Sequence, residues 1–70
     1  MDKKIEIILN GFKEKVPESI SILSILETFD ERDINVIVEH NGRFVYPQKY
    51  DSTLVSEGDI LEFINPDFGG

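Results

Sequence analysis

The sequence predicts an α+β fold in which one main helix lies across one face of a mixed sheet of about five strands. Three observations lead to this prediction. Two Asn-Gly pairs, Asn10-Gly11 and Asn41-Gly42, each stand between two runs of strand-forming residues. Between these two hairpins, apolar residues recur with the spacing of an amphipathic helix. A final apolar run near the end of the 70 residues adds the fifth strand.

The first hairpin is predicted from residues 4–17. Apolar side chains alternate along residues 4–9, which places every second one on the same face of a strand. Asn10-Gly11 tolerates the positive φ angles of a type I′ turn, and Pro17 ends the return strand. The apolar face of the first strand has Ile5, Ile7 and Leu9; the return strand has Phe12, Glu14 and Val16 on one face and Lys13 and Lys15 on the other.

The helix follows this hairpin. Ser21 is positioned to cap its N-terminus, because a serine hydroxyl accepts a hydrogen bond from a free backbone N–H of the first turn. The apolar stripe is lost after Asp30, so we expect the helix to end near that residue. The stripe consists of Ile22, Ile25, Leu26 and Phe29.

A second hairpin and a last strand complete the pattern. The β-branched run 36–39 is typical of a strand buried on much of both faces, and its partner strand ends before Pro47. In the polar loop 48–57 we expect Tyr50 and Leu54 to contact the core. Gly58-Asp59 then forms a tight turn into the last strand, 60–64.

These elements give the order ββαββ followed by a final strand, with the helix on one face of a mixed sheet. The order and the single helix predict a β-grasp, or ubiquitin-like, architecture. Connection rules favour central positions for the first and last strands, although the pattern alone does not determine the full strand order. We expect residues 1–65 to form the domain and residues 66–70 a flexible tail.

Charge and composition limit the function. Fourteen acidic and seven basic residues give a net charge of −7, which disfavours binding to nucleic acid or to anionic membranes and favours basic protein partners. Four lysines lie within residues 1–15, so the remainder of the chain is more acidic still. No targeting or membrane-spanning segment is predicted, and we expect a cytoplasmic protein.

The side chains offer little catalytic chemistry. The chain has no Cys, which removes thiol nucleophiles and cysteine-based metal sites. His40 is the only His, beside a hairpin turn, and we interpret it as a polar surface residue. No phosphate-binding loop or calcium-binding loop is present. We therefore expect neither an enzyme nor a bound cofactor or metal ion.

The last two residues, Gly69-Gly70, are the remaining candidate. Without Cβ atoms they form a thin strand of backbone that fits a narrow channel and leaves a terminal carboxylate unshielded. A carboxylate is ionised at neutral pH and is a poor acyl donor, so it must be activated, most directly by adenylation with ATP. A glycine-rich loose end without function is the alternative interpretation.

Taken in order, these pieces resemble the ubiquitin-like sulfur carriers, and within them the carriers of thiamine biosynthesis, the ThiS type. The resemblance covers the whole chain. Its landmarks are Asn10-Gly11, the segment Ile25-Leu26-Glu27, the run 36–39 with Asn41-Gly42, Tyr50, Gly58-Asp59, the strand Ile60-Leu61-Glu62 and the final Gly69-Gly70.

The resemblance implies a mechanism and partners. An adenylyltransferase of the ubiquitin-activating type would convert the Gly70 carboxylate to an acyl adenylate, and sulfur from a cysteine desulfurase or another donor would leave a thiocarboxylate. Thiazole synthase would then take the sulfur. By the same resemblance, Gly69 gives access to the channel and Phe68 anchors the tail at the partner's surface.

Pro66 departs from this pattern and is similar to the carriers that serve molybdopterin synthase, the MoaD type. The short length favours the thiamine type. Alternatives are therefore a carrier for molybdopterin or tungsten cofactor synthesis, a carrier for cysteine biosynthesis, a ubiquitin-like protein modifier, or a non-covalent β-grasp interaction domain.

Overall fold

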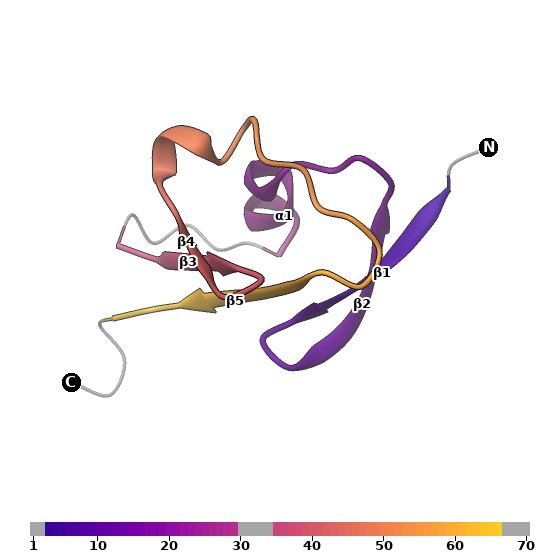
Figure 1. The fold of residues 1–70 in the computed structure, drawn as a ribbon, viewed down its shortest axis with the longest axis horizontal. Helices are drawn as coiled ribbons and strands as arrows, with labels where there is room; N and C mark the ends of the chain where they lie inside the picture. The colour runs from indigo at the N-terminus through magenta and orange to yellow at the C-terminus, as the bar shows by residue number, and fades with distance from the viewer. Residues whose placement is uncertain (1–2, 30–34, 67–70) are drawn as a thin grey trace.

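A computed structural model describes residues 3–29 and 35–66, which form one five-stranded mixed sheet with a helix against one face (Figure 1). The strand order is β2-β1-β5-β3-β4, so the first and last strands are central, as predicted. The elements are β1 (Lys4–Leu9), β2 (Phe12–Pro17), α1 (Ile22–Thr28), β3 (Ile37–His40), β4 (Arg43–Val45), a short 3₁₀ helix (Pro47–Lys49) and β5 (Ile60–Ile64).

The hairpin β1–β2 forms as the sequence predicts. The two strands are antiparallel with Leu9 opposite Phe12, and the turn between them has positive φ at Asn10 (51°) and Gly11 (86°). Side chains alternate along β1, so Ile5, Ile7 and Leu9 on one face are buried. Val16 of β2, which lies opposite Ile5, is buried on the same face. Phe12 shares that face but is 72% exposed, because it stands at the turn end of an edge strand.

The helix α1 begins at the predicted cap. The Ser21 hydroxyl accepts a hydrogen bond from the Ser24 backbone N–H at 3.1 Å. Three residues of the apolar stripe are buried against the sheet, whereas Phe29 follows the helix as its C-cap and is 37% exposed. The helix ends at Thr28; the predicted end near Asp30 lies outside the described residues. The buried stripe is Ile22, Ile25 and Leu26.

The second hairpin is also confirmed, with one correction. Asn41 (φ 53°) and Gly42 (φ 83°) form its turn, and β3 pairs with β4 on one side and β5 on the other. The prediction that β3 is buried on much of both faces is wrong: only Val38 is buried, and Ile37 and Glu39 on the other face are half-buried. The helix covers one face of the sheet only; on that face Val38 is buried and Val36 is partly buried against the core.

In the loop between β4 and β5, one of the two predicted core contacts is wrong. Tyr50 packs against the core as expected, but Leu54 is 53% exposed. Leu54 forms an isolated antiparallel bridge with Ser21, and the next residue, Val55, is the buried anchor, at 3% exposure. Because neighbouring side chains in extended backbone point to opposite sides, only one of the two can face the core.

The core lies between α1 and the sheet. Its largest fully buried side chains are Ile7, Ile22, Ile25, Leu61, Val16 and Val38. Every secondary-structure element except the 3₁₀ helix contributes to the buried cluster. Within residues 3–29 and 35–66, no helix is long and apolar enough to cross a membrane.

Docking of α1 should provide a large share of the stability, because its β-branched sequence is only a fair helix former. We predict that Ile25→Ala, which empties a fully buried site, lowers the free energy of unfolding by about 2–5 kcal/mol in urea denaturation. Leu23→Ala on the same helix is the control; Leu23 is 38% exposed and its loss should cost less than about 1 kcal/mol. Equal losses would contradict this view of the core.

Candidate functional site

The predicted functional residues Phe68, Gly69 and Gly70 lie outside the described residues. The structure instead describes the base of the tail, which is β5 followed by Asn65 and Pro66. The contacts of this strand determine how firmly the tail's starting point is held.

Strand β5 occupies the centre of the sheet. It pairs in parallel with β1, Leu61 lying opposite Leu9, and antiparallel with β3, Ile37 lying opposite Ile64. Leu61 is fully buried. Both edges of the strand are therefore hydrogen-bonded and its middle is fixed in the core, with β5 lying between β1 and β3 (Figure 1).

The asparagines of the two hairpin turns add hydrogen bonds to β5. The side-chain oxygen of Asn10 accepts from the Phe63 N–H at 2.8 Å, and its own N–H donates to the Leu61 carbonyl at 2.9 Å. Asn41 does the same at the other end of the strand: its side-chain oxygen accepts from the Ile60 N–H at 2.8 Å, and its N–H donates to the Ile60 carbonyl at 2.7 Å. The sequence predicted these residues only as turn formers.

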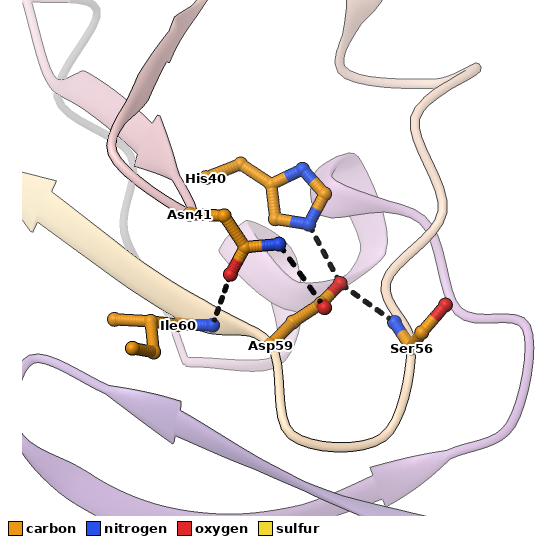
Figure 2. A network of polar contacts seen from close by, with 5 residues as sticks. All are labelled: His40, Asn41, Ser56, Asp59 and Ile60. Atoms are coloured by element: carbon orange, nitrogen blue, oxygen red, sulfur yellow. Dashed lines mark hydrogen bonds and ion pairs between the residues drawn. The ribbon is translucent and has the colours of Figure 1, made fainter.

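Asp59 connects the same end of β5 to the β3–β4 turn (Figure 2). Its carboxylate is within 2.7 Å of the His40 Nε2 and accepts from the Asn41 side-chain amide at 3.1 Å and the Ser56 N–H at 2.8 Å. Two segments distant in sequence, His40-Asn41 and residues 56–59, thus meet at one carboxylate. The interpretation of His40 as a simple surface residue is wrong: its side chain is 20% exposed and pairs with Asp59.

The ionisation of Asp59 reflects these contacts. Partial burial opposes the charged form, but the hydrogen bonds from His40, Ser56 and Asn41 and the charge of a protonated His40 outweigh it, so the pKa of Asp59 is below its ordinary value. This cluster fixes the start of β5; within the described part of the chain, no group of acidic, His or Cys residues is arranged to hold a metal ion.

The face of the sheet opposite α1, here called the outer face, carries exposed apolar residues near the end of β5. Side chains alternate along each strand, so the neighbours of buried Leu61, Val38 and Val45 point to this face. The Phe44 and Tyr46 rings pack edge to face, 4.7 Å between centroids. Phe44, Tyr46 and Ile64 are 50%, 62% and 40% exposed. We call Ile37, Phe44, Tyr46 and Ile64 the outer patch.

The strand order, the single helix and a central strand that leads into the last residues define a protein of the ubiquitin-like β-grasp class. The comparison with known families is more specific: the chain belongs to the ThiS family, whose model matches residues 3–70. This match includes the tail as well as the described domain.

A solved structure gives the same result. The chain is similar to a crystal structure of the thiamine biosynthesis protein ThiS from Geobacter metallireducens, with 29% sequence identity and a TM-score of 0.82. The alignment covers 94% of this chain and 100% of that one. No curated protein sequence matches the chain significantly. The predicted fold class and family resemblance are thus confirmed.

We predict that Asp59→Asn destabilises the fold by about 1–3 kcal/mol at neutral pH, because a carboxylate that accepts charge-assisted hydrogen bonds is lost. A lowered pKa contributes stability above the unfolded value of about 3.9 and loses it as the pH falls through the folded value. The difference from wild type should therefore shrink on acidification below about pH 4. Urea unfolding across this pH range tests it, with the exposed Asp51→Asn as control. A difference that is independent of pH would contradict the role of ionisation.

Proposed function

We propose that this chain is a sulfur carrier of thiamine biosynthesis and that the terminal carboxylate of Gly70 is the group that carries sulfur. The observation that supports this most directly is the ThiS family match, which extends through Gly69 and Gly70. The similarity to a thiamine biosynthesis protein over nearly the whole chain supports the same pathway.

The chemistry takes place in two stages. A carboxylate oxygen of Gly70 attacks the α-phosphorus of ATP, which forms an acyl adenylate and releases pyrophosphate. The terminal sulfur of a donor's persulfide then attacks the acyl carbon, and AMP leaves. A thiol then attacks the donor's remaining sulfur and breaks the S–S bond, which leaves the thiol and the donor joined by a disulfide and a thiocarboxylate on Gly70.

The partners follow from these steps. An adenylyltransferase of the ubiquitin-activating type supplies ATP and the catalytic groups, a cysteine desulfurase or another persulfide donor supplies sulfur, and thiazole synthase consumes the thiocarboxylate. The carrier is a co-substrate rather than a catalyst, and we place it in the cytoplasm with these enzymes. Its net charge of −7 suits partners with basic rims, because opposite charges speed encounter.

The domain contributes a rigid base and a surface. Residues 1–65 hold the central strand β5, and residues 66–70 form the tail that enters the partner's active site. Gly69 lets the tail pass through a narrow channel because it has no side chain. Phe68 adds an apolar contact at the channel entrance. An enzyme that binds this tail approaches from the end of β5, where the outer patch is exposed.

The terminal carboxylate itself can be tested. We predict that deleting Gly70, or adding one residue after it, abolishes ATP–pyrophosphate exchange by the adenylyltransferase encoded in the same genome. The reacting carboxylate is then displaced by about 3.5 Å along an extended chain, far outside a productive geometry.

The matched control carries the same added residue before Met1 and should retain full exchange. Thermal unfolding of all three variants should be unchanged, because each change lies outside the hydrogen-bonded strands, which begin at Lys4 and end at Ile64. Full exchange by the Gly70 deletion would overturn the proposed function.

A further inference from the structure

Two acidic residues face each other on the outer face. Glu39 of β3 lies directly opposite Glu62 of β5 in the antiparallel register. Like charges at directly opposed positions of a sheet are destabilising. In the part of the chain that the structure describes, neither carboxylate forms a hydrogen bond or an ion pair. The fold thus carries an unfavourable pair without internal compensation.

The surroundings of this pair are aromatic and apolar. On its other side Glu39 lies opposite Phe44, so one row across three strands reads Glu62, Glu39, Phe44. The next row contains the opposed pair Ile37 and Ile64. The exposed ring of Tyr46 packs on Phe44. Two carboxylates therefore border the outer patch, on the face that adjoins the start of the tail.

Among the described strands, the cations on this face lie away from the two glutamates, on β2 or at the start of β1. Lys13 and Lys15 are on β2, and Lys4 is on β1, whereas the two glutamates are on β5 and β3. One strand, β1, lies between β2 and β5, so two strand spacings, about 10 Å, separate β2 from Glu62. Arg43 is adjacent to Phe44 in β4 and points to the opposite face. Within residues 3–29 and 35–66, neither carboxylate has a lysine or arginine as ion-pair partner, so the cation that fits between them would come from another molecule.

We propose that this surface receives an arginine side chain of the enzyme that binds the tail. A guanidinium is planar, donates several hydrogen bonds in fixed directions and stacks on aromatic rings, so it can contact both carboxylates and the Phe44 ring together. Its aliphatic stem can lie on the outer patch. A lysine ammonium is more strongly hydrated and has no flat face for the ring. The inference rests on the proposed function: it specifies that the enzyme binding this carrier contacts the outer face through an arginine.

The opposed glutamates lower the stability of the fold and strengthen binding to the partner. Removing their charges should therefore raise the unfolding temperature and weaken binding. The double variant Glu39→Gln/Glu62→Gln should unfold at a higher temperature than wild type, because the repulsion is removed. In ATP–pyrophosphate exchange with the adenylyltransferase of the same genome, its KM should rise roughly tenfold with kcat unchanged, because charge pairs act on binding rather than on chemistry. Glu18→Gln/Glu27→Gln has the same net charge, changes exposed residues away from this face, and should raise the KM little.

The identity of the cation can be tested on the enzyme. With ATP saturating, wild-type carrier should protect one arginine of the adenylyltransferase from phenylglyoxal, detected by peptide mass spectrometry, and the double glutamine variant should not. Loss of protection together with the raised KM supports the inference.

The other outcomes contradict either the proposed function or the inference about the arginine. If wild type itself supports no exchange, the proposed function fails and this inference fails with it. If wild type is activated but the double variant keeps its KM, or no arginine is protected, the inference alone fails. Sedimentation that shows a wild-type dimer lost in the double variant would assign this surface to a second copy of the chain instead.

Discussion

The structure depends on the position of β5 between β1 and β3. This strand is hydrogen-bonded along both edges, and the turns of both hairpins bind it through asparagine side chains and N–H groups. Asp59 holds its first residue by joining His40, Asn41 and Ser56 (Figure 2). In the proposed function the reacting carboxylate lies a few residues beyond this strand, and a loose base would spread that carboxylate over many positions.

Periodicity predicted most of the fold. Alternation in β1, the helical stripe of α1 and the two Asn-Gly turns are local signals, and each was confirmed in place. The errors concern long-range contacts. Whether Leu54 or Val55 faces the core depends on a bridge to Ser21, and the environment of His40 depends on Asp59, 19 residues later in the chain. Local patterns contain no information on such contacts, because they arise only when distant segments pack together.

Part of the candidate site could likewise be predicted from local sequence, and part depends on long-range contacts. Gly69 and Gly70 stand out in the sequence, and the family match includes them, whereas the surface beside the tail could not be predicted. The opposition of Glu39 and Glu62 depends on the register between β3 and β5, and the exposure of Phe44 and Tyr46 depends on which face the helix covers. Once the register is known, these residues combine into the surface for which we propose a basic partner.

In the proposed function the chemistry takes place at one group, the carboxylate of Gly70, and the rest of the chain provides its base and its recognition surface. Intact mass spectrometry of the protein purified from its native host tests this claim most directly. We predict a fraction whose mass is increased by the exchange of one oxygen for one sulfur, with fragmentation placing the change on Gly70. A chain that is never modified under thiamine limitation, or sulfur found on any other residue, would contradict the account.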